Sequence, residues 1–542
     1  MQEELIEELR NPFFILFISA LLSWCVVSSS QLGDTVEIEL KAYRLQQYDL
    51  AGSLRGSRSW KVMYEAVSLN SNSLRRSVLV SWHDLVGKNL QLLFGGGVGA
   101  LIIVIPANFS TLSSSDRLRF SDLERQLVML NTDMAVYVTH EQPQLKALFA
   151  DVSAFSTRAP TAVQQLFYAI AGNTFQFSST ASPANIIVKP YSPNIVGRLW
   201  ALDRSAPVVL LVAHYDSHSA VPALSTGSDS NGSGVVALLE LLAIFARFYA
   251  SVTTKPKYNL LFLFSAGGKF NYQGTRQWIE DHIEKRIEDN IEVVMCLDTI
   301  GKGDGLVMHV SKMPTETTPT GKLFSRLQAA TPKGRKMEIV SKKINLVADV
   351  LSWEHEKYSI KRLPAFTLSH LKSHNDPARA SMLDTVEDVD VKALKANIRT
   401  IGEALLGYIL SLPNSKCAEA NGTSSCSLLK DNAVEIERIS YWMHRYGSRP
   451  RPLAGENMWF TTELRDLITR YAMEKASMEP VTLSDLTLYE VLKDTVAAHR
   501  VKPAVFELFL AAVIGLYLAG IYFATQNIHL FLERTVEKLK KP

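Results

Sequence analysis

Short, continuous apolar runs alternate with longer amphipathic stretches between residues 185 and 412 of the chain. Apolar runs of that length are typical of strands buried on both faces of a sheet. The predicted strands are residues 207–213, 258–264, 292–297, 305–310 and 363–368, and the predicted helices between them are 234–249 and 275–286. This alternation implies right-handed crossovers and predicts a doubly wound α/β domain with a mainly parallel sheet.

The flanking regions have weaker patterns. Residues 31–184 contain apolar runs separated by polar, serine-rich stretches, which predicts a smaller N-terminal α/β lobe. Residues 413–502 are polar, with helical periodicity and without strongly apolar runs. We therefore expect a helical, membrane-proximal connector in that segment.

Apolar segments near both chain ends predict a membrane protein. Residues 13–27 are apolar and are followed by three serines, which predicts a signal peptide over residues 1–30. The acidic residues before this run are unusual for a signal, so an uncleaved anchor is the alternative. Residues 503–525 carry one charge, Glu507, and are long enough to span a bilayer. With a cytosolic tail at 526–542, the prediction is a single-pass, type I protein whose bulk is lumenal.

Small residues recur inside the predicted span. Ala511, Gly515 and Ala519 are four residues apart, so they share one helix face on which another membrane helix could approach closely. A chance arrangement of common residue types is the alternative.

Composition narrows the function. The chain has 542 residues, too many for a single small domain, and its 57 basic residues against 54 acidic ones leave little net charge for binding nucleic acid.

A lumenal location would allow two modifications of the chain. Cys417 and Cys426 could form a disulfide, and Asn108 and Asn421 lie in glycosylation sequons.

Polar side chains of metal-ligand type follow the predicted strands of the large domain. They are His214, Asp216, Asp229, Asp298, His370 and His374. Ligands collect at the carboxyl ends of parallel strands, and histidine with carboxylates is a donor set that suits zinc. Singly, each residue is most simply a cap, a turn residue or a core histidine. Together they indicate a site.

This set resembles the zinc aminopeptidases related to bacterial double-zinc leucyl aminopeptidases, over residues 185–412. His214 and Asp216, Asp229, Asp298, and either His370 or His374 match four of that family's five motifs. The fifth supplies a general base and a zinc-ligand glutamate, and here those positions hold Gly268 and Lys269. The resemblance therefore implies the fold without the chemistry, with no metal, no cofactor and no catalytic residue.

Lys269 stands where the aminopeptidases have a glutamate. Its ammonium group could therefore supply the positive charge that a metal ion would otherwise bring to the site. An ammonium group between Asp229 and Asp298 would repel a cation and pair with both carboxylates. We therefore predict that Lys269 pairs with these two carboxylates.

A longer resemblance is to the nicalins, a family related to nicastrin that keeps the peptidase fold without activity. It rests on residues 46–49 (QQYD), 268–274 (GKFNYQG), 353–356 (WEHE), 363–370 (LPAFTLSH) and 498–506 (AHRVKPAVF). The resemblance implies a glycoprotein of the endoplasmic-reticulum membrane. It also implies two partners, the Nodal modulator protein and a small multi-pass membrane protein. This complex works beside the translocon and ribosome in multi-pass membrane protein biogenesis, and is linked to Nodal signalling.

Three functions remain open at this point. The favoured one is a non-catalytic scaffold whose lumenal domain binds partners and whose span recruits a membrane subunit. The second is an active zinc aminopeptidase with an unorthodox base. The third is a receptor whose cleft binds a peptide amine or small ligand through Asp229 and Asp298.

Overall fold

The computed structural model describes most of the chain. The described residues are Ser19, Ala20 and Ser23, then 36–69, 76–90, 98–157, 174–188, 192–251, 256–285, 290–412, 427–453, 458–490, 493–502 and 504–539. The predicted signal peptide, apart from those three residues, therefore lies outside the described part, and so do Cys417, Cys426 and Asn421.

The large domain is built on an eight-stranded sheet of order β15-β14-β16-β13-β11-β12-β10-β17. Its four central strands, which are mutually parallel, are β16 (Ala365–Ser369), β13 (Ile291–Leu297), β11 (Val208–His214) and β12 (Asn259–Ser265). The outer strands are β10 (Asn194–Leu199), β17 (Ser477–Glu479), β14 (Gly305–Val310) and β15 (Lys336–Ser341). Because β10 and β14 run antiparallel to the centre, the predicted mainly parallel, doubly wound sheet is a mixed sheet.

Both faces of this sheet are covered. Along β11, Val209 and Leu211 contribute to one core cluster, whereas Val208 and Leu210 contribute to another. The first cluster includes side chains from α8 (Gly234–Ala250), α10 (Pro319–Ala330), α12 (Val391–Ile409), α13 (Ile436–Trp442) and α14 (Met458–Tyr471). The second includes side chains from α9 (Gln273–Ile279) and α11 (His355–Ile360). Burial on both faces explains why the strands are continuously apolar.

The smaller lobe is a closed barrel of order β1-β19-β9-β4-β5-β6-β8. Its strands are β1 (Val36–Arg44), β4 (Met63–Val67), β5 (Ser77–Ser81), β6 (Ala100–Ile105), β8 (Ala135–His140), β9 (Thr174–Ser179) and β19 (Lys493–Val501). Its helices are α3 (Trp82–Leu85), α5 (Ser114–Val128) and α6 (Pro143–Thr157). A small sheet joins β2 (Tyr48–Leu50), β3 (Ser53–Ser57), β7 (Asn131–Thr132) and β18 (Leu486–Leu488).

The predicted helical connector over residues 413–502 is wrong in one respect. Two helices, α13 and α14, do lie there, but the same segment supplies three strands to three different sheets. β17 joins the large sheet, β18 pairs with β2, and β19 lies between β1 and β9 in the barrel. Only Val496 and Ala498 of β19 are buried, so its apolar pattern in the sequence is weak. Its partner strands β1 and β9 also lie hundreds of residues earlier in the chain.

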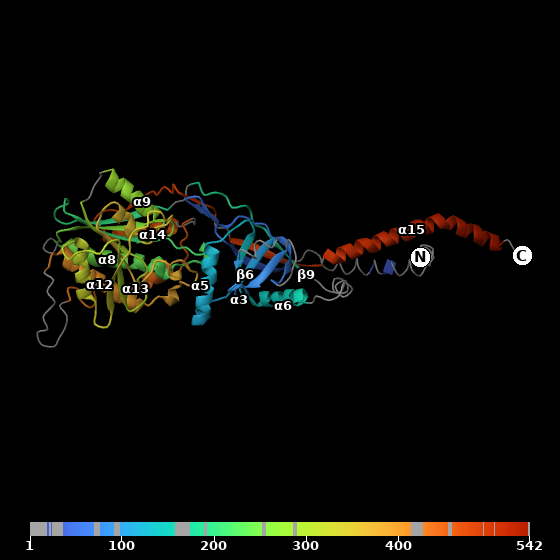
Figure 1. The fold of residues 1–542 in the computed structure, drawn as a ribbon, viewed down its shortest axis with the longest axis horizontal. Helices are drawn as coiled ribbons and strands as arrows, with labels where there is room; N and C mark the ends of the chain where they lie inside the picture. Colours follow the sequence, from blue (N-terminus) through green and yellow to red (C-terminus); the bar gives the residue numbers. More distant parts are fainter. Residues whose placement is uncertain are drawn as a thin grey trace.

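The last helix, α15 (Ala504–Leu539), projects away from the folded body, whereas α8, α12 and α14 lie at the opposite end of the molecule (Figure 1). Its window Phe506–Phe523 is apolar enough to cross a membrane and only 17% of it is buried. The segment Ser228–Ala250, which contains α8, passes the same test of composition, but 78% of its apolar window is buried, so α8 is a core helix. Helix α15 continues beyond residue 525, so the described part of the predicted cytosolic tail, residues 526–539, is helical as well.

Candidate functional site

The polar residues that follow the central strands meet at one edge of the large sheet. His214 ends β11, Asp298 follows β13 and His370 follows β16, and these three strands are neighbours. Asp229 lies in the turn Ser228–Ser233, directly before α8. The residues thus occupy the position at which parallel sheets build their sites.

Asp298 is paired with an arginine that the sequence did not point to. Nη2 of Arg379 lies 2.5 Å from Oδ2 of Asp298, which is fully buried. Burial by itself would raise the pKa of Asp298, but Arg379 and the other nearby cations outweigh it and hold that pKa well below its usual range. The guanidinium also donates to the Tyr272 hydroxyl at 3.0 Å and lies 4.3 Å above the Trp353 ring. Arg379 is therefore fixed in place.

Asp229 is paired with His370. Nε2 of His370 lies 2.9 Å from Oδ2 of Asp229, and Oδ1 accepts hydrogen bonds from Ser233 Oγ and the Gly301 amide. Burial opposes ionisation of Asp229, yet its bond to His370 and the charge of nearby Lys302 give a net lowering of its pKa. The structure places His370, and not His374, on this carboxylate. Nε2 of His374 instead lies 3.3 Å from Nζ of Lys342.

Gly268 and Lys269 lie in a loop that packs against His214 and Asp216. A Cβ atom on Gly268 would lie 2.2 Å from Cγ of His214, so the imidazole ring packs directly on this glycine. The amides of Gly268 and Lys269 donate to the Asp216 carboxylate at 2.7 and 3.0 Å. The Asp216 carboxylate therefore holds this loop. In a zinc site a carboxylate at this place would instead orient the histidine ligand.

Lys269 does not form the predicted pair with Asp229 and Asp298. Its Nζ donates to Ser230 Oγ at 2.6 Å and to the Arg379 carbonyl at 2.8 Å. Among the ion pairs of the described residues, Asp298 is held by Arg379 and Asp229 by His370. Burial lowers the pKa of Lys269 to about 8. Lys269 thus stabilises the segment that carries Arg379 through these hydrogen bonds. It does not form the ion pairs expected of a group that replaces a metal ion.

Two further carboxylates belong to the site and were missed. Asp384 accepts hydrogen bonds from the Asp229 and Ser230 amides, and burial raises its pKa to about 6. Glu354 accepts from Ser265 and Thr275, and its other oxygen lies 3.5 Å from Nδ1 of His214. Neither lies at the end of a strand, so position alone could not reveal them. Glu354 was visible only as part of a string shared with the nicalins.

The donor set does not fit a catalytic zinc ion. Zinc needs three or four converging nitrogen, sulfur or oxygen ligands, and a catalytic site keeps one position open. Among the described residues, no group of three or more histidines, cysteines or carboxylates is arranged to hold a metal. Arg379 instead binds Asp298, and His370 is hydrogen-bonded to Asp229.

The smaller lobe holds the segment that carries Arg379 and Asp384. Glu124 of α5, which is 2% exposed, accepts hydrogen bonds from Ser381 Oγ at 2.6 Å and the Met382 amide at 2.8 Å. Arg117 of the same helix forms a two-pronged ion pair with Asp388. The position of this segment therefore depends on both lobes.

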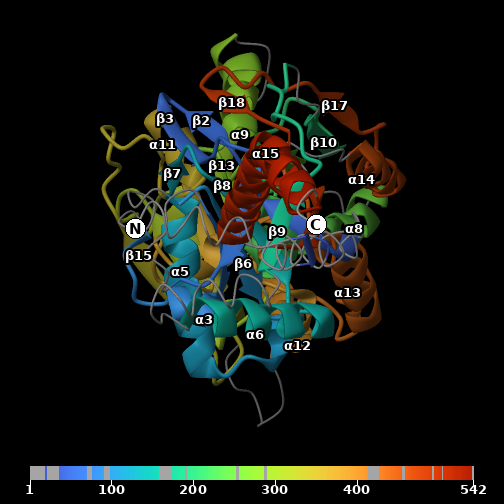
Figure 2. The ribbon, with the colours of Figure 1, turned by 90° about the vertical axis from the view of Figure 1, so that its right-hand side faces the viewer.

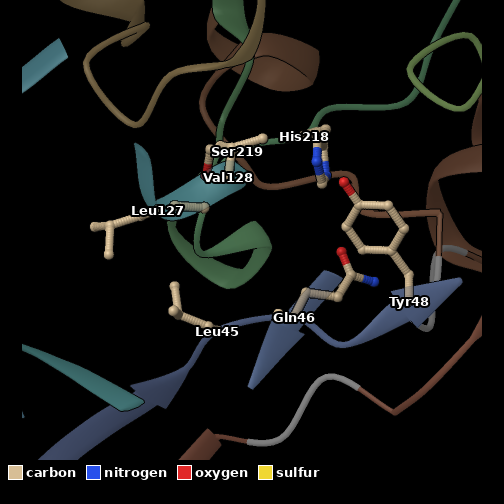
Figure 3. A pocket seen from close by; sticks show the side chains of 9 residues that line it. Leu45, Gln46, Tyr48, Leu127, Val128, His218 and Ser219 are labelled. Carbon is tan, nitrogen blue, oxygen red and sulfur yellow. The ribbon is translucent and has the colours of Figure 1, made fainter. Parts of the chain in front are cut away.

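A small cavity also lies between the lobes (Figure 3). In the close-up, the side chains of Tyr48 and His218 point toward one another, and their rings meet edge to face at 5.6 Å. The cavity holds only about 10 Å³, which is room for about one water molecule. Burial, with Lys269 nearby, lowers the pKa of His218 to about 4, so this ring is neutral at pH 7. The cavity is a packing gap and not a ligand site.

Comparison with known proteins identifies the type of fold. Residues 194–405 match the family model described as peptidase family M28. The crystal structure of the gamma-secretase component nicastrin superposes with a TM-score of 0.55 at 10% identity, covering 86% of this chain and 99% of that one, and so shares the fold. The large domain is thus a peptidase-like domain of the M28 type.

The relatives give a narrower assignment. Nicalin from Caenorhabditis elegans is 40% identical over 566 residues, covering 100% of both chains. The protein named BOS complex subunit NCLN from Homo sapiens is 34% identical and covers 97% of this chain and 95% of its own length. The chain belongs to the nicalin family.

Proposed function

We propose that this protein is a non-catalytic subunit of a BOS complex, anchored in the membrane by α15. The observation that carries the proposal is the contact between His214 and Gly268. At the position where a peptidase needs its base, there is a glycine whose surface is covered by an imidazole ring.

The chemical reason follows from what zinc hydrolysis requires. A base must lie within hydrogen-bond reach of a metal-bound water molecule. Gly268 supplies no such group, and Lys269 is engaged with Ser230 and the Arg379 carbonyl. The pairing of Arg379 with Asp298 then uses a carboxylate that would otherwise be available to a metal. The site is consistent with a structural role.

The proposed location is the endoplasmic-reticulum membrane, with the two lobes in the lumen. Support comes from the exposed apolar window of α15 and from the exposed Asn108, which lies in a glycosylation sequon. The sequon at Asn421 and the pair Cys417 and Cys426 would be modified in the same compartment. By its resemblance to the nicalins, the protein would join the Nodal modulator protein and a small multi-pass membrane protein beside the translocon. There it would assist multi-pass membrane proteins, with an effect on Nodal signalling.

One experiment tests the absence of catalysis. The full chain, purified in detergent, is analysed for zinc and assayed on a panel of amino-acid amides, with an active M28 peptidase as the positive control. We expect no stoichiometric zinc and no hydrolysis. One or two zinc ions per chain with chelator-sensitive hydrolysis would support the aminopeptidase alternative and overturn the proposal.

A second experiment tests the receptor alternative. Arg379 already binds Asp298 and His370 already binds Asp229, so the carboxylates that would capture a peptide amine are paired within the chain. We therefore expect no thermal stabilisation by amino-acid amides or short peptides. A rise in the unfolding midpoint that is lost in Asp229→Asn would favour the receptor instead.

A further inference from the structure

The large sheet ends in an unpaired edge. Strand β15 is the terminal strand, and among the described residues it pairs only with β14. None of its six residues is buried. Figure 2, which views the molecule along its long axis, places β15 at the periphery. An open edge presents a row of main-chain donors and acceptors to which another strand can add.

The register shows which amides face outward. The amides of Lys336 and Lys342 donate to β14, at the carbonyls of Asp304 and Val310. Hydrogen bonding alternates along a strand, so the amides of Met337, Ile339 and Ser341 point away from β14. Met337 and Ile339 also pack their side chains against the main core, whereas Ser341 is exposed.

An exposed apolar loop follows this edge. Leu346 is 74% exposed and Val347 is 92% exposed, and both precede a third exposed aliphatic residue, Val350. Asn271 holds the loop at its far end. Its side chain donates to the Asp349 carbonyl at 2.8 Å and accepts from the Leu351 amide at 3.1 Å.

The residue that holds this loop belongs to the altered part of the candidate site. Asn271 follows Gly268 and Lys269 in the same short segment, and Tyr272 next to it donates to the Ser352 carbonyl. The segment that would carry catalytic glutamates in a peptidase therefore supports an exposed apolar loop in this chain. Leu346 and Val347 are adjacent, and neighbouring apolar side chains that are exposed together are more typical of protein contact sites than single ones.

Charge selects the kind of partner. Exposed lysines lie along the edge and beside the loop, namely Lys312, Lys336 and Lys343. Two acidic side chains lie in the same region: Glu338 on the strand is 3.5 Å from Lys372, and Asp349 in the loop is exposed, so the exposed lysines outnumber the exposed carboxylate of the loop. A second copy of the chain would bring lysines against lysines. A lipid surface is disfavoured because the large domain lies at the end of the molecule opposite α15 (Figure 1).

We propose that the β15 edge and the loop 345–350 together dock an extended, acidic segment of a protein partner, which adds as a further strand to the sheet. Main-chain hydrogen bonds to the outward amides would align the segment, and an apolar side chain would cover Leu346 and Val347. This inference rests on the proposed scaffold function, since it names the chemistry of one partner.

The test uses the full chain in membranes of cells that express it, with a photo-crosslinking residue at position 347. A control probe is placed at Leu202, which is 67% exposed elsewhere on the large domain. Ser341→Pro removes an outward amide without touching the bonds to β14, and Ser341→Ala is its matched control. Lys343→Glu tests the charge and alters only an exposed side chain.

The expected result is an adduct from position 347, absent from position 202, whose crosslinked peptide contains more acidic than basic residues. Loss of one or two main-chain hydrogen bonds should lower its yield about tenfold in Ser341→Pro. Ser341→Ala should keep the yield and Lys343→Glu should lower it. Hydrogen exchange at residues 337–341 should slow in the complex.

Four outcomes would overturn the inference: no adduct, an adduct with a second copy or a lipid, a non-acidic peptide, or equal yields from Ser341→Pro and Ser341→Ala. If Ser341→Pro lowers the unfolding midpoint, its adduct yield no longer reports on the lost hydrogen bond. The adduct yield of Lys343→Glu then tests the inference. Membrane subunits that still co-purify after such a failure would leave the proposed function intact, so the two failures are distinguishable.

Discussion

Arg379 and Asp298 form a buried ion pair at the centre of the candidate site, with Nη2 and Oδ2 only 2.5 Å apart. The arginine reaches this position on a segment that the smaller lobe also grips, through Glu124. The pair thus links the edge of the sheet that carries the candidate site to the contact between the two lobes.

Removing the arginine should destabilise the fold. In Arg379→Met the buried carboxylate of Asp298 loses its partner, and breaking a buried pair in this way costs about 3–5 kcal/mol. Urea unfolding of the full chain in detergent measures the loss. As a control, Arg465→Ala removes the ion pair with exposed Asp466 and should cost less than about 1 kcal/mol. Equal costs for the two variants would contradict the structural role of Arg379.

The contact between His214 and Gly268 can be tested by a double-mutant cycle. Gly268→Ala places a Cβ atom against the imidazole and should cost about 1–3 kcal/mol. Cβ of His214 lies 2.4 Å from that position as well, so only His214→Gly removes the whole clash, and Gly268→Ala should cost less in that background. Unfolding free energies of the four proteins measure the coupling. Strict additivity would show that the His214 side chain does not pack on the glycine.

The buried contact of Glu124 with Ser381 and Met382 should make the free energy of unfolding depend on pH. Burial raises the pKa of Glu124 from 4.5 to about 7. The folded state therefore holds this proton more tightly, and the resulting stabilisation is present below about pH 4.5 and lost as the pH rises through 7. Compared with Glu124→Gln, the wild-type free energy of unfolding should fall by roughly 3 kcal/mol across this window. A difference that stays constant from acid to neutral pH would contradict the assignment.

The membrane helix gives a prediction about assembly. Among the described residues, and apart from its chain neighbours and its own helix backbone, no atom lies within 4 Å of a Cβ built on Gly515. Gly515→Leu should therefore leave the folded body unchanged and block close approach of a partner helix. We expect less of the membrane subunit to co-purify. Tyr517→Leu, on the opposite side of the helix at 100° per residue, is the control. Unchanged co-purification in Gly515→Leu would argue against a contact on this face.

The proposed lumenal orientation predicts glycosylation at Asn108. This side chain is exposed at the start of a short turn, whereas the sequon asparagine Asn231 is fully buried and donates to the Leu297 carbonyl. Asn108→Gln should therefore remove one glycan, seen as a mobility shift that glycosidase treatment abolishes. Glycosidase-sensitive mobility should not change when Asn231 is the residue replaced. A wild-type chain whose mobility is unaffected by glycosidase would place the lobes outside the lumen.

The sequence by itself determined the features that depend on local pattern. Continuous apolar runs indicated the central strands, and the residues at their ends included His214, Asp298 and His370. The length and polarity of the apolar stretch near the C-terminus indicated the helix that became α15. The sequence also showed that Gly268 and Lys269 occupy the positions at which the aminopeptidase resemblance implies glutamates.

The tertiary structure decided which groups pair with the charged side chains of the candidate site. Asp298 takes its partner from Arg379, 81 residues later, and the lobe barrel is completed by β19, far from its neighbours β1 and β9. Such pairings have no local signal, because an arginine in a loop and a strand with two buried residues look ordinary in sequence. The partner of a buried charge depends on which segments the fold brings together, and only the packing of both lobes brings Arg379 to Asp298.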